Sequence, residues 1–196
     1  MHAIRCLGLV GLLAATAVVQ AAPVTYTLDP DHTQVLFSWS HFGYSNPGAY
    51  LGLGSGTLVF DEQHPGRSSV RVSLPLSELD THVAALDMHL QQADFLDAAK
   101  YPQVTFQSTR VQPLGGNKFK VTGDLTMHGV TRSVALDATL NRVGVHPMSK
   151  RQSIGFGATT QIKRSEFGVG AYVPNVGDEL TVRITAEGAV AAAAQK

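Results

Sequence analysis

The sequence predicts a mainly all-β fold, an antiparallel β-barrel with one short helical insert. Apolar residues recur at every second position through most of the chain, as in strands with one buried and one solvated face. Clusters of Gly, Pro, Asn and Asp separate these runs and indicate turns. About seven to nine strands would leave exposed edges unless the sheet closes or stacks, so a barrel or a sandwich follows.

The 196 residues fit one domain, because globular domains typically hold ~100–200 residues. Hydrophobic residues make up 44% of the chain, which is enough to build a core and disfavours disorder. Fifteen basic residues balance 15 acidic ones. This balance argues against a nucleic-acid-binding protein, which usually carries a basic stripe, and against a polybasic membrane-surface protein.

Residues 1–22 are expected to be a cleaved signal peptide. Arg5 supplies a positive start, residues 6–19 are apolar, and small residues follow where a signal peptidase would cut. About 14 apolar residues fall short of the ~20 that cross a bilayer, so no stable membrane span is expected. Cys6 is the only cysteine and would leave with the signal. The mature chain, 23–196, is then a single exported domain without disulfides, in a bacterial periplasm or outside the cell.

Period-two runs predict the strands of the mature chain. They span residues 35–41, 69–76, 104–107, 118–126, 133–140, 154–162 and 180–186. A further run, 51–60, carries Gly52, Gly54 and Gly56 at alternate positions. Glycines inside a strand indicate a barrel corner or a close approach of backbones. Interior space left for a ligand and a weak edge strand are the alternatives.

The helical insert is predicted between residues 76 and 100, where the period of the apolar residues changes. Segments 84–90 and 93–99 place apolar residues three and four positions apart, which is typical of helices. One insert between two strands is too little for an α/β fold. A barrel that carries one helical flap is therefore the simpler prediction.

The sequence offers no catalytic or metal-binding constellation. On a helix, His82 and His89 would lie ~10.5 Å apart along the axis, too far to share one zinc ion. His32 and His41 would lie about 30 Å apart on a continuous strand. Ser55 lacks the outer glycines of a nucleophile elbow. We expect no catalytic residue and no bound metal.

Five segments in sequence order are similar to one known family. They span residues 26–41, 79–97, 101–109, 121–131 and 162–168. Together they resemble the YceI-like periplasmic proteins, which are described as polyisoprenoid-binding. The resemblance runs through nearly the whole mature chain. It implies that residues 23–196 form a lipocalin-like antiparallel barrel whose elongated apolar lumen holds a long-chain amphiphile.

Nine residues are predicted to bind this ligand: Phe37, Trp39, His41, Phe106, Phe119, Leu125, Phe156, Arg164 and Phe167. Most of the apolar ones lie on predicted dry faces and would line a lumen; plain core packing is the alternative. His41 shares a face with Phe37 and Trp39, and would hydrogen-bond either a head group or a backbone carbonyl. Arg164 follows a strand, and a guanidinium at a barrel mouth suits a pyrophosphate, quinone or carboxyl head group. A surface arginine is the alternative.

The leading expectation is a periplasmic, non-catalytic carrier of polyisoprenoid or other long-chain amphiphilic lipids. We expect it to bind a long-chain isoprenoid or fatty lipid and not to bind nucleic acid. A homodimer is implied by the family resemblance alone. No cofactor is expected, and a bound isoprenoid lipid or quinone would be the ligand. The alternatives are a lipid-modifying enzyme that uses His41 or His128 as a base, and a stress-response interaction module with a filled core.

Overall fold

A computed structural model of the chain describes residues 22–192. The expected signal peptide therefore lies outside the described residues except for Ala22. The described strands are β1 (Val24–Leu28), β2 (Gln34–Ser38), β3 (Gly48–Gly52), β4 (Ser55–Phe60), β5 (Ser69–Pro75), β6 (Leu79–Asp80), β7 (Gln103–Gly115), β8 (Lys118–Met127), β9 (Val130–Val145), β10 (Gln152–Lys163) and β11 (Glu179–Ala189). The α-helix among them is α1 (Ala84–Leu90), and short 3₁₀ helices are η1 (Pro30–His32), η2 (Pro65–Arg67), η3 (Leu76–Glu78) and η4 (Arg164–Phe167). None of the helices within 22–192 has the length and apolar character needed to cross a bilayer.

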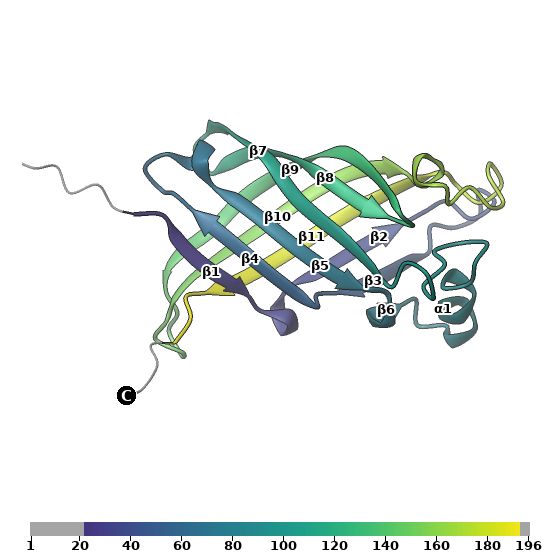
Figure 1. The fold of residues 1–196 in the computed structure, drawn as a ribbon, viewed down its shortest axis with the longest axis horizontal. Coiled ribbons are helices and arrows are strands. Elements are labelled where there is room, and N and C mark those ends of the chain that lie inside the picture. Colours follow the sequence, from purple (N-terminus) through teal and green to yellow (C-terminus); the bar gives the residue numbers. More distant parts are fainter. Residues whose placement is uncertain (1–21, 193–196) are drawn as a thin grey trace, which may run out of the picture.

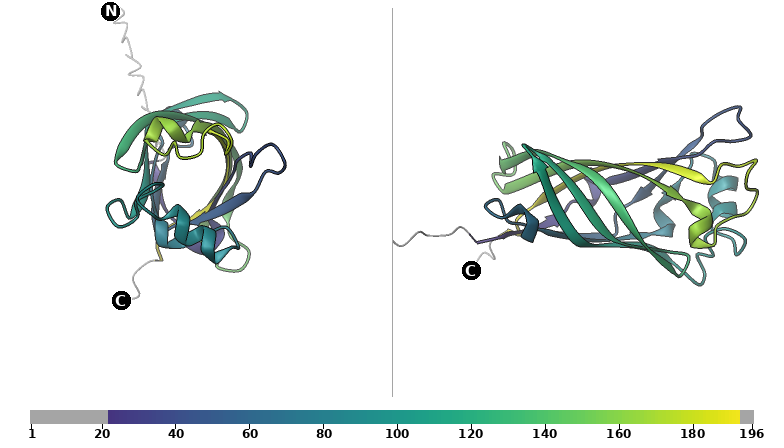
Figure 2. Two further views of the ribbon diagram at one scale, coloured as in Figure 1. Left: turned by 90° about the vertical axis from the view of Figure 1, so that its right-hand side faces the viewer. Right: turned by 90° about the horizontal axis from the view of Figure 1, so that it is seen from above.

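The strands form one antiparallel sheet that closes on itself. Eight strands make the ring in the order β1-β4-β5-β7-β8-β9-β10-β11, and β11 pairs back with β1. The ring is plain when the molecule is viewed along its axis (Figure 2). Closure removes the sheet edges that an open antiparallel sheet would expose. For residues 22–192, the predicted antiparallel barrel with one short helical insert is confirmed.

The short strands β2, β3 and β6 extend three walls of the barrel. Strands β1 and β2 both pair with β11, and their other neighbours are β4 and β3 respectively. Strand β6 pairs with β3 in the same way that β5 pairs with β4. Each of these walls thus consists of two strands with one interruption. The interruption is η1 between β1 and β2, the bend at Leu53 and Gly54 between β3 and β4, and η3 between β5 and β6.

The barrel has two different ends (Figure 1). We call the end that carries α1 the helix end; it holds segments 39–47, 76–102 and 164–178. We call the other the turn end; it holds the short connections between β4 and β5, β7 and β8, and β9 and β10. The start of β1 and the last strand residues of β11 also lie at the turn end.

Two local expectations need correction. Helix α1 matches the predicted 84–90, but residues 93–99 form a series of turns. Asp97 has a left-handed φ of 47°, and the Ala98 amide donates to the Gln91 carbonyl, seven residues back. That pattern cannot continue an α-helix, whose bonds run four residues back. The predicted strand 51–60 is two strands with a bend between them.

The glycines of this bend are explained by close approach. A Cβ on Gly54 would lie 2.8 Å from Pro75 Cδ, and one on Gly56 would lie 2.6 Å from Leu28 Cδ1. Both distances are shorter than real Cβ contacts, so only glycine fits. The side chain of Leu28 occupies the space beside Gly56, which is therefore not left for a ligand. Strand β4 is paired on both sides and is not an edge strand.

Candidate ligand-binding cavity

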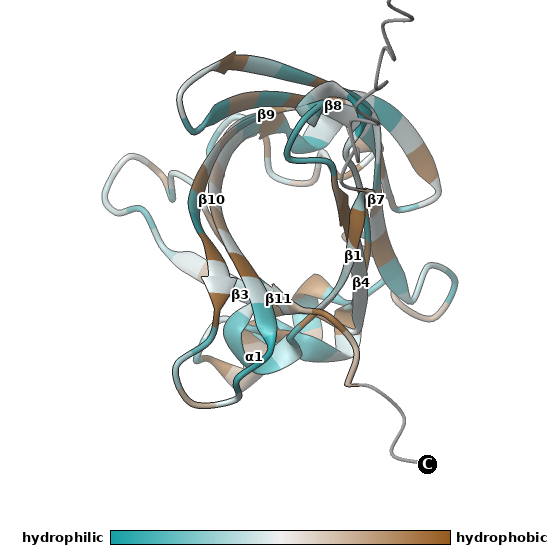
Figure 3. Ribbon diagram, turned by 90° about the vertical axis from the view of Figure 1, so that its left-hand side faces the viewer, coloured by the Kyte–Doolittle hydropathy of each residue, from teal (hydrophilic) through white to brown (hydrophobic). Residues whose placement is uncertain are grey.

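The interior of the barrel holds an apolar cavity of about 280 Å³. Inward-facing side chains of every strand in the ring line it, for example Val72 of β5, Val121 of β8 and Ile162 of β10. The hydropathy bands that alternate along the strands in Figure 3 reflect the period of two that turns these residues inward. The volume lies close to the lower limit of known small-molecule pockets, which measure about 300–1,000 Å³. Side chains therefore do not completely fill the interior of the barrel.

The cavity is long relative to its volume. Along β10 it is lined from Ile154 to Ile162, a stretch of roughly 27 Å at ~3.4 Å per residue. With the usual strand tilt of about 40°, this corresponds to roughly 20 Å along the barrel axis. Leu90, Phe95 and Leu96 line the cavity at the helix end. A narrow, extended apolar space of this kind suits a chain more than a compact ring system.

Four of the five polar residues of the cavity wall, all but Ser69, form side-chain hydrogen bonds within the protein. The polar residues of the wall are Thr33, Ser68, Ser69, Thr160 and Arg164. The Thr33 hydroxyl donates to the Glu187 carbonyl at 3.2 Å, and the Thr160 hydroxyl donates to the Ala135 carbonyl at 2.8 Å. Within residues 22–192, no buried side-chain nitrogen or oxygen lacks a hydrogen-bond partner. The lumen thus offers apolar contact, and a charged head group would be poorly solvated inside it.

Arg164 is buried in the wall and binds a loop of the protein itself. Its Nε donates to the Gly177 carbonyl at 2.9 Å, and its two terminal nitrogens donate to the Val169 and Val176 carbonyls at 2.8 Å each. Burial lowers the pKa of the guanidinium, and the nearby Asp178 carboxylate opposes that shift. The surface-arginine alternative is wrong, because only 5% of the residue is exposed. Three of its five N–H groups anchor residues 169–177 at the helix end.

Six of the predicted apolar residues line the cavity as expected: Phe37, Trp39, Phe106, Phe119, Leu125 and Phe156. Arg164 lines it as well. Phe167 does not; it is 1% exposed and packs in η4 beside the barrel wall. Whether any of these residues contacts a ligand stays a prediction.

His41 lies outside the cavity, so its expected place on the dry face is wrong. Strand β2 ends at Ser38, and the period of two is lost before residue 41 is reached. The backbone of His41 bridges to Ser45 and Val176, and its ring packs edge-on against Phe42. The side chain is exposed to solvent at the helix end.

The structure adds cavity residues that the sequence analysis did not select. Phe60 lines the cavity and lies at an alternate position of the run 51–60, so the period could have identified it. Phe95 could not be found in this way, because it belongs to an irregular segment. Its ring stacks on Tyr172 with centroids 5.9 Å apart and meets the His89 ring edge-on at 4.9 Å.

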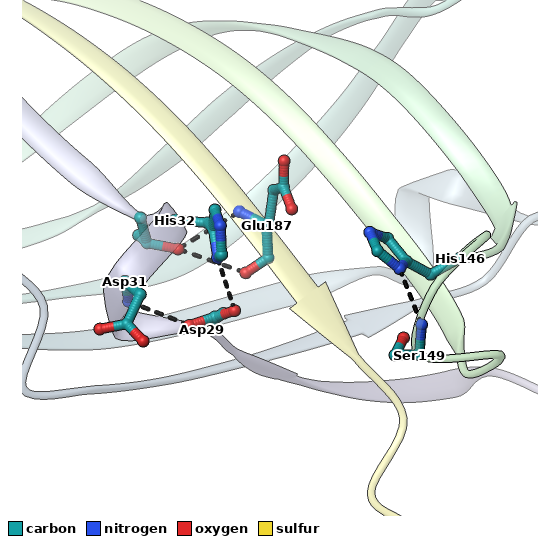
Figure 4. Close-up of polar contacts among 7 residues, drawn as sticks. Asp29, Asp31, His32, His146, Ser149 and Glu187 are labelled. Carbon is teal, nitrogen blue, oxygen red and sulfur yellow. Dashed lines mark hydrogen bonds and ion pairs between the residues drawn. The ribbon is translucent and has the colours of Figure 1, made fainter.

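The ionisable groups form no centre inside the barrel. None of the histidines in residues 22–192 lines the cavity, and no group of three or more His, Cys, Asp or Glu residues there could hold a metal. A polar cluster does occur outside, at η1 (Figure 4). His32 Nδ1 lies 2.8 Å from Asp29 Oδ2; this hydrogen bond raises the pKa of His32 and lowers that of Asp29. Its exposed position and local contacts fit a turn-stabilising role.

Comparison with known proteins gives consistent matches over most of the chain. Residues 26–188 match the family model described as the YceI-like domain. Protein YceI of Escherichia coli O157:H7 is 36% identical over 185 residues, 92% of this chain and 96% of that protein. A UPF0312 protein of Pseudomonas syringae pv. tomato is 37% identical over 171 residues, 86% of this chain and 88% of that protein.

Solved structures share the barrel. The crystal structure of Burkholderia cenocepacia BcnA matches with a TM-score of 0.74 and 25% identity, over 82% of this chain and 98% of that one. A polyisoprenoid-binding domain from Saccharophagus degradans, implicated in plant cell wall breakdown, matches with a TM-score of 0.65 over 85% of this chain and 98% of that one. At 12% identity, the second match supports the fold alone.

Proposed function

The chain belongs to the YceI-like family, and from that premise we propose that it is a non-catalytic binding or carrier protein for polyisoprenoids or other long-chain amphiphilic lipids. We place it in the periplasm, to which a signal peptide in residues 1–22 would direct it. The Saccharophagus degradans domain, which shares the fold, is described as polyisoprenoid-binding, and the proposal extends this ligand class to the present chain.

The apolar cavity is the observation that carries the proposal. It is lined by the whole ring of strands, and within residues 22–192 no fully buried side-chain nitrogen or oxygen lacks a hydrogen-bond partner. Each methylene transferred from water into such a space gains ~0.8 kcal/mol. Ordering a flexible chain and losing its translational freedom offset much of that gain. A long apolar chain still retains a net driving force, whereas a small polar ligand would lose its hydration without replacement bonds.

The position of the histidines supports binding without catalysis. The enzymatic alternative relied on His41 or His128 as a base in the lumen, and neither lines the cavity. His128 lies in the turn between β8 and β9, where its Nδ1 is 3.2 Å from the Phe167 carbonyl. Measuring turnover of extracted lipids by the protein and by a His41→Ala variant tests this directly. A carrier gives no product in either form.

Native mass spectrometry of the protein purified from its own periplasm, followed by organic extraction, tests the binding function. We expect a discrete adduct that extraction identifies as a prenyl lipid, a quinone or another long-chain amphiphile. The same spectrum reports whether the protein is a homodimer. A mass without adduct, with no uptake of added long-chain lipids, would overturn the proposal.

A matched pair of variants assigns the adduct to the lumen. Ala158 of β10 lines the cavity, and Thr159 beside it faces solvent. Ala158→Phe therefore adds a ring inside the barrel, and Thr159→Phe adds the same ring outside, because neighbouring strand residues face opposite ways. We expect the adduct to be lost or greatly reduced in Ala158→Phe and retained in Thr159→Phe. Equal occupancy in both would place the ligand outside the lumen.

A further inference from the structure

Three phenylalanine rings meet across the inside of the barrel. Phe60, Phe119 and Phe156 belong to β4, β8 and β10, and no two of these strands are neighbours in the ring. The ring centroids are 6.5 Å apart for Phe60 and Phe119, 6.1 Å for Phe60 and Phe156, and 6.2 Å for Phe119 and Phe156. All three pairs pack edge to face, the favoured aromatic geometry. Side chains from three sides of the barrel thus form one contact in its interior.

This phenylalanine triad (Phe60, Phe119 and Phe156) lies towards the turn end. Phe60 is the last residue of β4, and Phe119 is the second residue of β8, immediately after the turn that joins β7 to β8. Each of the three strands is hydrogen-bonded on both sides. The rings are therefore carried by backbone that cannot move without opening the sheet, and such segments have the highest local stability.

The helix end is built differently. Leu90, Phe95 and Leu96 line the cavity there; Leu90 is the last residue of α1, and the other two belong to the turns that follow it. Helix α1 itself has no buried residue, and Tyr172, which stacks on Phe95, is 57% exposed. Its short, exposed helix and the small amount of sheet structure make this end the one that opens at lower cost.

Phe106 gives a useful contrast within the same cavity. It is as deeply buried as two members of the triad, at 7% exposure against 6% for Phe60 and Phe119. Its ring lies against the wall over Gly123, where a Cβ would collide with the Phe106 ring. No aromatic contact joins Phe106 to the triad. A ring that lies along the wall narrows the lumen but does not block it.

From this arrangement we propose that the phenylalanine triad is the floor of the ligand site and sets the longest chain that the lumen accepts. The inference rests on the proposed lipid-binding function. The chain enters from the helix end, its apolar terminus stops at the three rings, and the head group stays near the helix end. Lengthening the chain adds affinity until the terminus reaches the triad and adds none beyond it.

Competition between prenols of increasing length tests the floor. Successive pairs, from geraniol and farnesol upwards by one isoprene unit, are mixed at equal concentration with the lipid-free protein. Native mass spectrometry then measures their relative occupancy. We expect the longer member to win by more than about tenfold while the chain fits, since each added isoprene unit buries further apolar carbons, whose gain exceeds the cost of ordering them. Beyond a definite chain length, the ratio of the longer to the shorter bound prenol should fall to one or below.

Substitutions in the triad should change the longest prenol that the lumen accepts. Phe119→Leu and Phe156→Leu remove the rings while keeping an apolar side chain, and should extend the preferred chain by at least one isoprene unit. Phe119→Trp should shorten it. Phe106→Leu is the matched control, and it should weaken short and long prenols alike without moving the limit. Trp39, the single tryptophan of the chain, lines the cavity, so its fluorescence reports binding independently in the wild type and in the three leucine variants.

The outcomes separate this inference from the function on which it rests. A wild-type protein that binds no prenol of any length overturns both. A protein that binds prenols with no length limit, or with the same limit in Phe119→Leu, Phe156→Leu and Phe106→Leu, overturns the floor alone. Triad variants that change only the rate of prenol uptake would make the triad an entrance instead, and would also overturn the floor.

Discussion

Replacing Arg164 with methionine should destabilise the protein strongly, although the arginine forms no ion pair within hydrogen-bonding distance. The substitution keeps a long side chain in the wall but removes three N–H donors. The carbonyls of Val169, Val176 and Gly177 then lose their partners. The bond to Val169 is buried, and the other two are partly buried, so water can replace only some of what is lost.

The expected magnitude follows from the burial of those carbonyls. A buried acceptor left without a partner costs ~1–3 kcal/mol, and a lost bond that water can replace costs ~0.5–1.5 kcal/mol. One of the first kind and two of the second give a loss of roughly 2–6 kcal/mol. Removing a charge whose burial is unfavourable, as the lowered pKa of Arg164 indicates, returns part of this. We therefore expect the free energy of unfolding to fall by about 3 kcal/mol, which for a domain of this size corresponds to roughly 6–12 °C in Tm.

Urea and thermal unfolding of lipid-free protein measure this effect. Lipid must be removed first, because a ligand that binds only the folded state raises the apparent stability. Arg183→Met is the matched control, since Arg183 is exposed on the outer face of β11, and surface changes stay within about 0.5 kcal/mol. An Arg164→Met protein as stable as Arg183→Met would refute the reasoning. So would an unchanged Tm with a lower urea slope, which would indicate a change in the denatured state instead.

Two further predictions concern packing and pH. Gly123→Ala should lower the free energy of unfolding by about 1–3 kcal/mol, because the new methyl group collides with the Phe106 ring. Gly157→Ala on β10 is the control, since the nearest neighbours of its new methyl group would be 3.9 Å away. In the same urea titration it should lower the free energy of unfolding much less. The folded-state pKa of His32 is raised by Asp29, so the pair contributes stability below the unfolded pKa of about 6.5 and loses it as pH rises through the folded value. The Tm of His32→Gln should therefore lie below that of the wild type near pH 5.5 and converge with it at alkaline pH. A gap that widens with pH would contradict this sign.

Much of the cavity wall could be predicted because it depends on a local rule. In a strand, every second side chain faces the same way whatever the partner strand is. Phe37, Phe106 and Phe156 were therefore placed on the inner face without knowing their neighbours. The same rule failed at His41, because the chain beyond β2 turns at residues 41–45, and in a turn the period of two no longer sets the direction of a side chain.

The sequence by itself determined the antiparallel strands and the helix at 84–90, which follow from hydrophobic period and turn residues, and its resemblance to a known family implied the closed barrel and its apolar lumen. Only the tertiary structure decided what the lumen contains at its two ends. Arg164 is bound by carbonyls up to 13 residues away, and the triad unites Phe60 with Phe156 across the barrel. Such contacts depend on barrel closure and on which strands face each other across the lumen, and no local pattern in the chain encodes that geometry.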